Sequence, residues 1–187
     1  MRNMRIPLAI FVAFIILGSN APARAHSHAG GAFKLMPVGT VTVGSASADT
    51  AVAFAIQGFF DYEIVRYLYI GAAPQLILNV KDKDASSSGE QLDLFARIMV
   101  RYPVGQKIQL YGYLAPGFSV IFVPDKPSGF SNPTGFVLGF AGGVSYSITP
   151  SLFVGGEIGY QIGFQSSGGT DFKTRYLHIG FVIGTMF

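Results

Sequence analysis

The sequence contains no cysteine, and only 12% of its 187 residues are charged. The absence of cysteine excludes disulfide bonds, thiolate zinc sites and thiol catalysis. The scarcity of charge argues against an ordinary water-soluble surface, because 50% of the residues are hydrophobic and the mean hydropathy is +0.43. After residue 17 there is no apolar run near the ~20 residues that a membrane-spanning helix needs. Glycine (24 residues) and phenylalanine (17 residues) are abundant instead.

Residues 1–25 have the features of a secretory signal peptide. Arg2 and Arg5 precede an apolar stretch from Ile6 to Leu17, and Ala23-Arg24-Ala25 places small residues at both cleavage-site positions. The alternative is an uncleaved membrane anchor, for which this stretch is short. Cleavage would leave ten basic and ten acidic side chains. The net positive charge of the whole chain therefore comes from the predicted signal peptide, and no nucleic-acid partner is expected.

The rest of the chain alternates with period 2 between large apolar residues and small or polar ones. From Phe136 to Ile148 the even positions are mostly large and apolar, whereas the odd positions are mostly Gly, Ala or Ser. Such alternation is typical of strands that have one face in apolar surroundings. It predicts eight strands, at residues 33–44, 52–61, 68–80, 92–101, 108–122, 136–148, 152–165 and 172–187. The connections alternate between short ones at 62–66, 102–107 and 149–151 and longer polar ones at 45–50, 81–90, 123–134 and 166–171.

Eight antiparallel strands are compatible with two kinds of closed barrel. A lipocalin-like soluble barrel would turn its apolar face inward around a ligand and its polar face toward water. Here the polar face has too few charges for an exterior, so we predict an all-β fold, an eight-stranded antiparallel up-and-down transmembrane β-barrel over residues 33–187. In the last strand, Leu177 to Phe187 would span ~25 Å, the height of the apolar band, with Arg175 and Lys173 just above it.

The last strand also carries the most specific motif, since it ends in Phe187 with Ile183, Phe181 and Ile179 at alternating positions before it. On this motif and the eight alternating segments, the chain resembles the small bacterial outer-membrane β-barrel domain family, and is similar to the transmembrane part of outer-membrane protein A and to outer-membrane protein X. The resemblance implies a monomer in the bacterial outer membrane, in contact with lipid and lipopolysaccharide. It also implies an assembly signal in the last strand, read by the barrel-assembly machinery with the help of periplasmic chaperones. Both termini are then expected in the periplasm, with residues 26–32 as a short periplasmic tail.

Polar side chains on the inward face define a candidate site in the lumen. They are Arg97, Glu157, Asp93, Arg101, Tyr111, Tyr113 and His178. Arg97 and Glu157 are both expected ~13–15 Å above the short-turn rim. We hypothesise that they pair beside the two tyrosines and close the lumen, because a lone buried charge costs several kcal/mol. The alternative is that each charge is hydrated or paired locally.

These features favour a non-enzymatic protein with a structural or surface-interaction role, a mostly occluded lumen and no cofactor. A narrow gated, porin-like channel for small solutes is the first alternative, because Gly139, Gly143, Gly155 and Gly159 leave room opposite the tyrosines. A lipid-modifying membrane enzyme is the second. His178 is the one histidine in the predicted barrel and has no serine at a suitable spacing on its strand, so no catalytic residue is predicted.

Two further predicted sites lie outside the lumen. Lys173 and Arg175 could contact lipopolysaccharide phosphates through charge-assisted hydrogen bonds, although snorkelling and loop solvation would explain the same residues. Cleavage after Ala25 would expose His26 and His28, and a free amine followed by a histidine at the third position can bind Cu(II) or Ni(II). Incidental histidines in a flexible tail are the alternative. No other metal site is predicted.

Overall fold

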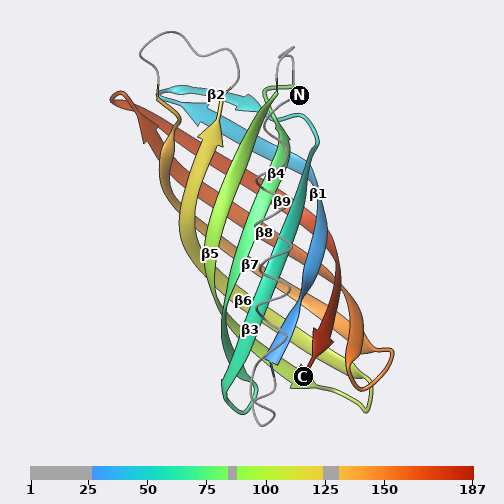
Figure 1. Cartoon of the computed structure of the whole chain (residues 1–187). Coiled ribbons are helices and arrows are strands. Elements are labelled where there is room, and N and C mark those ends of the chain that lie inside the picture. The colour runs from blue at the N-terminus through green and yellow to red at the C-terminus, as the bar shows by residue number, and fades with distance from the viewer. Residues whose placement is uncertain (1–26, 84–87, 124–130) are drawn as a thin grey trace, which may run out of the picture.

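The computed structural model describes residues 27–83, 88–123 and 131–187, which form a closed antiparallel β-barrel (Figure 1). The strands are β1 (Ser27–Val43), β2 (Ala46–Asp49), β3 (Ala53–Val65), β4 (Leu68–Val80), β5 (Gly89–Pro103), β6 (Ile108–Phe122), β7 (Thr134–Ser147), β8 (Leu152–Ser167) and β9 (Thr170–Met186). Each long strand pairs with its neighbours in sequence, and β2 is a short extension that pairs with the end of β1. Within the described ranges no helix is long and apolar enough to cross a membrane.

Pairing of the first and last strands closes the barrel. The β1–β9 register runs from His28 opposite Met186 to Val43 opposite Phe172. At the end of this seam the Ser27 amide donates to the Phe187 carbonyl at 2.8 Å, and the Phe187 amide donates to the Ser27 carbonyl at 3.1 Å. Closure leaves no long strand with an unpaired edge, which is a requirement for a β-structure in lipid. The predicted fold class, an eight-stranded up-and-down barrel, is confirmed.

The two ends of the barrel differ in their connections. One end, called here the short-turn end, carries the connections at residues 66–67, 104–107 and 148–151 together with Ser27 and Phe187. The opposite, long-loop end carries β2 and the connections β4–β5 and β6–β7. One predicted long loop is wrong: β8 and β9 are joined by Gly168-Gly169 alone, with φ of +56° and +81°. The polar residues on either side, which favoured a loop, are paired strand residues, as in Ser167 opposite Thr170.

The first strand begins earlier than the sequence predicts. Residues 27–32, expected in a periplasmic tail, are the start of β1 and pair with both β3 and β9. The run Ala29-Gly30-Gly31-Ala32 has no large side chains, so the alternation that reveals a strand is missing there. Small residues are needed at this point, because a Cβ on Gly30 would collide with the Ile183 carbonyl oxygen. The predicted signal peptide at residues 1–25 lies outside the described residues.

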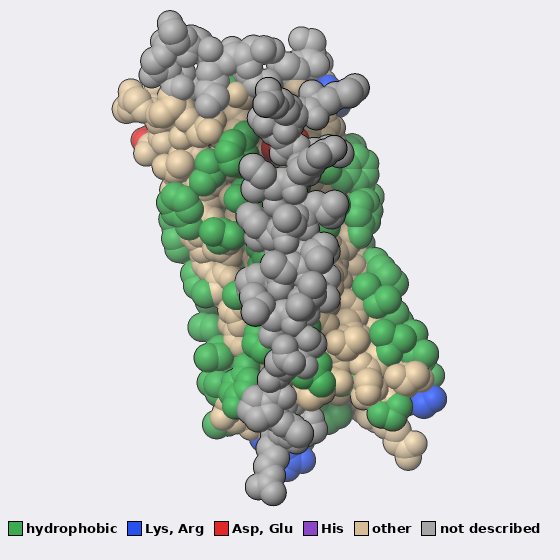
Figure 2. Space-filling model, viewed as in Figure 1, with side chains coloured by type: hydrophobic (Ala, Val, Ile, Leu, Met, Phe, Trp, Pro, Cys, Tyr) green, Lys and Arg blue, Asp and Glu red, His purple; other side chains and the backbone are tan. Residues whose placement is uncertain are grey.

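The apolar face of the barrel is its exterior. Phe136 and Ile158 are 49% and 57% exposed, whereas Arg97 and Glu157 are buried inside. Hydrophobic side chains cover much of the described outer surface between the two ends, and lysine and arginine side chains are visible at the ends (Figure 2). The lipocalin-like alternative is therefore wrong, because it would place these groups the other way round.

Candidate functional site: the polar lumen

Glu157 on β8 is the centre of one buried polar cluster. Its Oε1 accepts a hydrogen bond from the Tyr113 hydroxyl at 3.0 Å and lies 3.3 Å from the Lys34 ammonium, while Oε2 accepts from the Tyr111 hydroxyl at 3.2 Å. The Nε2 atom of His178 is 3.5 Å from Oε1. The carboxylate is thus surrounded by donor groups from three other strands, as a buried charge requires.

Arg97 on β5 forms a second buried ion pair. Its Nε lies 3.6 Å from Asp61 Oδ1, and its guanidinium carbon is 4.3 Å from the centroid of the Tyr113 ring and 5.0 Å from that of Phe59. The predicted Arg97–Glu157 pair is therefore wrong: the partner of Arg97 is Asp61, and the partner of Glu157 is Lys34. Both predicted charges are still held in buried ion pairs in the lumen, but with different partners.

Glycines determine which residues meet. Lys34 and Glu157 both lie opposite Gly180 on the intervening strand β9, where a Cβ would lie 2.9 Å from Cγ of Glu157. Arg97 and Asp61 likewise lie on either side of Gly71 on β4, where a Cβ would collide with an Asp61 carboxylate oxygen.

The contact between Tyr111 and Glu157 repeats the arrangement across Gly143 on β7. At that glycine a Cβ would lie 2.6 Å from Cζ of Tyr111. In these three contacts the partners lie on strands two apart in the barrel, and the strand between them has a glycine at the position that faces them.

Asp93 on β5 has a different environment, made of amides. Its carboxylate accepts hydrogen bonds from the side-chain amides of Gln161 at 2.6 Å, Gln91 at 2.9 Å and Gln75 at 3.3 Å. Gln75 also donates to Gln161 at 2.8 Å. Among the described residues no cation forms an ion pair with Asp93, so three amide donors stabilise the charge instead.

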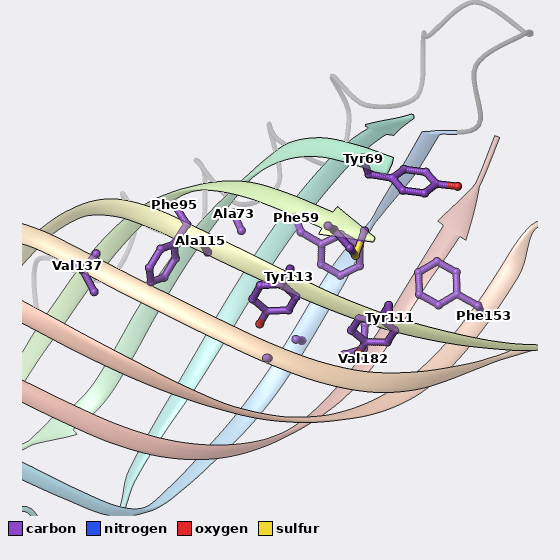
Figure 3. Packing of buried hydrophobic residues seen from close by; sticks show 13 residues of the cluster. Phe59, Tyr69, Ala73, Phe95, Tyr111, Tyr113, Ala115, Val137, Phe153 and Val182 are labelled. Atoms are coloured by element: carbon purple, nitrogen blue, oxygen red, sulfur yellow. The ribbon is translucent and has the colours of Figure 1, made fainter. Parts of the chain in front are cut away.

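The polar clusters and an apolar cluster fill the lumen. Figure 3 shows the apolar residues, among them Phe59, Phe95 and Phe153, inside the ring of strands. The buried charged side chains are balanced in sign, with Lys34, Arg97 and Arg101 against Asp61, Asp93 and Glu157. An internal cavity beside Glu157 measures about 10 Å³. A single water needs roughly 10–15 Å³, so this cavity holds one water at most.

The structure does not support the N-terminal metal site. His28 is buried in β1, with its ring centroid 4.9 Å from that of Tyr69 and 5.8 Å from that of Phe153. It is therefore not part of a flexible tail, and His26 lies outside the described residues. No group of three or more possible metal ligands occurs in the part of the chain that the structure describes.

Sequence reasoning missed Lys34 and Asp61, the partners in both ion pairs. Each lies on the inward face of its strand, and Lys34 alternates with the exposed Phe33 and Leu35. This alternation was a usable signal for Lys34. For Asp61, at the end of the predicted strand 52–61, no local pattern in the sequence indicates a pairing with Arg97.

The remaining predicted residues lie on the outer face of β9. Ile179, Phe181, Ile183 and Phe187 are all exposed there. Lys173 lies over the ring of Phe164 at 5.0 Å near the long-loop end, and Arg175 is exposed.

The family model of the outer membrane protein beta-barrel domain matches residues 9–183. The chain belongs to this family. It is an integral β-barrel protein of the bacterial outer membrane. No curated protein matches the chain in sequence.

Solved structures of other outer-membrane barrels share the fold of this family member. Neisserial surface protein A is 17% identical with a TM-score of 0.53, over 86% of this chain and 97% of that one. OprG from Pseudomonas aeruginosa is 16% identical with a TM-score of 0.58, and the match covers 87% of this chain and 95% of OprG. At these identities the likeness concerns the fold alone.

Proposed function

We propose that this outer-membrane barrel is a non-enzymatic, monomeric protein with a structural or surface-interaction role, whose lumen does not conduct. The observation that supports this proposal is the packing of the interior, where paired polar side chains and aromatic rings surround a cavity of about 10 Å³ beside Glu157. A diffusion pathway needs a continuous wet passage. Eight strands enclose an interior just wide enough for side chains to fill.

In this proposal the short-turn end faces the periplasm and the long-loop end faces outward. The arrangement follows the usual plan of such barrels, with short periplasmic turns and longer extracellular loops. It would place Lys173 and Arg175 beside the outer leaflet, where lipopolysaccharide phosphates lie. The exposed apolar side chains of β9 would be presented to the barrel-assembly machinery during insertion.

Planar-bilayer recording of the purified, refolded protein tests the proposal. We expect no steady conductance from the wild type. The matched comparison is a Tyr111→Ala/Tyr113→Ala variant. It removes two hydrogen-bond donors to Glu157 and two aromatic rings from the lumen, so we expect brief channel openings. A steady, large conductance in the wild type would contradict a closed lumen and favour the porin-like channel.

A further inference from the structure

A second cavity lies at the short-turn end, apart from the clusters around Glu157 and Asp93. It measures about 600 Å³ and opens between the β3–β4 turn and the adjoining ends of β5 and β6. This volume is within the range of small-molecule sites, roughly 300–1,000 Å³. The residues that line it and that the argument uses are Glu63, Arg66, Tyr67, Tyr69, Arg101 and Gln109.

Arg101 forms the inner wall of this cavity. It lines both the 600 Å³ cavity and the small internal one, so its side chain separates the outside from the lumen. The residue is only 4% exposed. Its guanidinium carbon lies 4.8 Å from the centroid of Phe153 and 5.2 Å from that of Tyr111, and these two rings hold the group in place.

The hydrogen bonding of Arg101 is incomplete. Nη1 donates to Gln109 Oε1 at 3.2 Å, but the buried Nε has no hydrogen-bond partner. No carboxylate of the described residues forms an ion pair with Arg101, and the nearby Asp61 is paired with Arg97. Arg101 thus shares the charge of Asp61 with Arg97 and has no ion pair of its own, so an anion that entered the cavity would gain a preformed partner.

The charged residues that line the cavity are two arginines and one glutamate. Arg66 and Arg101 face a single carboxylate, that of Glu63, which already accepts a hydrogen bond from the Tyr67 amide at 3.0 Å. This mainly cationic lining suits an anionic ligand.

The β3–β4 turn is strained in a way that presents an aromatic ring. Tyr67 has φ of +71°, a left-handed conformation that favours glycine and costs a bulky residue free energy. Its ring packs against Tyr102 at 5.3 Å between centroids and under the Arg66 guanidinium at 4.8 Å, and its carbonyl accepts from the Arg101 amide at 2.9 Å. A glycine would relieve the strain but would remove the Tyr67 side chain from the lining of the cavity.

We propose that this cavity is a binding site for a small organic carboxylate with a flat, apolar body. The carboxylate pairs with Arg101 at the inner wall, Arg66 adds a second, exposed cation, and the body lies along Tyr67 and Tyr69. The site goes beyond the proposed role of the barrel, because it requires neither conduction nor surface adhesion.

Calorimetric titration of the full-length protein in uncharged detergent tests this site, with benzoate as the probe. Benzamide is the uncharged control ligand, and acetate and inorganic phosphate are anions without a ring. We expect saturable benzoate binding at about millimolar concentrations, and about tenfold weaker binding of the other three. No saturable binding of benzoate, or equal binding of benzamide or phosphate, would overturn the proposal.

Variants tie the binding to the named residues. Arg101→Gln should weaken benzoate binding about tenfold, because it removes the charged partner. Lys107→Gln is the matched control, since Lys107 is a cation at the same end that lies over Tyr146 rather than lining the cavity. Arg66→Gln, in an exposed turn, provides the second test should Arg101→Gln fail to fold, as judged by heat-modifiable gel migration. The assignment would be overturned if benzoate affinity were unchanged in both Arg66→Gln and folded Arg101→Gln. It would also be overturned if Lys107→Gln lost as much benzoate affinity as Arg101→Gln.

Discussion

At the scale of single residues, the lumen depends on glycines as much as on charges. Gly71, Gly143 and Gly180 each lie between two polar side chains that meet across the strand in between. A side chain at any of them would occupy the space in which the partners touch. In an interior that side chains nearly fill, the residue without a side chain decides which contacts form.

Replacing one of these glycines should be costly, and its neighbour offers a matched control. Gly143→Ala puts a Cβ 2.6 Å from Cζ of Tyr111 and 2.5 Å from the Gly156 carbonyl oxygen, so tyrosine or backbone must shift. Gly142 faces outward, and a Cβ there has its nearest neighbour at 3.8 Å. We expect the free energy of unfolding, from urea titration in lipid vesicles, to fall by about 1–3 kcal/mol in Gly143→Ala and hardly in Gly142→Ala. Equal losses would contradict this account.

The pairing of Glu157 can be tested by double-mutant cycles. Lys34→Met leaves a buried carboxylate without its cation, and we expect a loss of about 3–5 kcal/mol in the free energy of unfolding. The Lys34→Met/Glu157→Gln double variant should lose less free energy of unfolding than the two single variants lose together. We expect the difference, which is the coupling energy, to be about 1–3 kcal/mol. The cycle between Arg97→Met and Glu157→Gln should give a smaller coupling, because the partner of Arg97 is Asp61. A larger coupling for Arg97 would restore the pairing that the sequence predicted.

At the scale of elements, β9 presents different chemistry at its two ends. Toward the short-turn end its outer face is apolar, with Ile179, Phe181 and Ile183 exposed, and toward the long-loop end it carries Lys173 and Arg175. Apolar side chains match the hydrocarbon core, and cations at its edge match phosphates.

Heat stability tests the proposed contact between β9 and lipopolysaccharide. Lys173→Ser/Arg175→Ser should lower the melting temperature in lipopolysaccharide micelles, because charge-assisted contacts to phosphates are lost. In uncharged detergent the same variant should melt like the wild type. Lys107→Ser, at the short-turn end, is the control and should have no effect in either medium. If the double variant matches the wild type in lipopolysaccharide, snorkelling explains the two cations.

The extent of the elements was predictable where side chains contrast in size. The predicted strand 68–80 coincides with β4. The start of β1 at Ser27 was not predicted, because the alanines and glycines of its first residues carry no period-2 signal. The last residues of β8 and the first residues of β9 were missed for a different reason. Their polar residues continue the hairpin beyond the apolar belt, where polarity no longer distinguishes a strand from a loop.

At the scale of the whole molecule, orientation in the membrane is the property that decides which surface meets other cells. An epitope inserted after Lys83, in the β4–β5 connection, should be labelled on intact cells. An epitope after Pro150, in the β7–β8 turn, should be labelled only after permeabilisation, because short turns of such barrels face the periplasm. Labelling of Pro150 insertions on intact cells would reverse the proposed orientation.

The sequence by itself determined the strand number, the membrane environment and the inward or outward direction of most side chains. These properties follow from local alternation and from the scarcity of charge, both of which can be read along the chain. Only the tertiary structure decided which inward charges meet. Lys34 and Glu157 are far apart in sequence and lie on strands two apart in the closed barrel, with Gly180 between them. Their relative height depends on the stagger of every strand around the barrel, and no local pattern encodes that stagger.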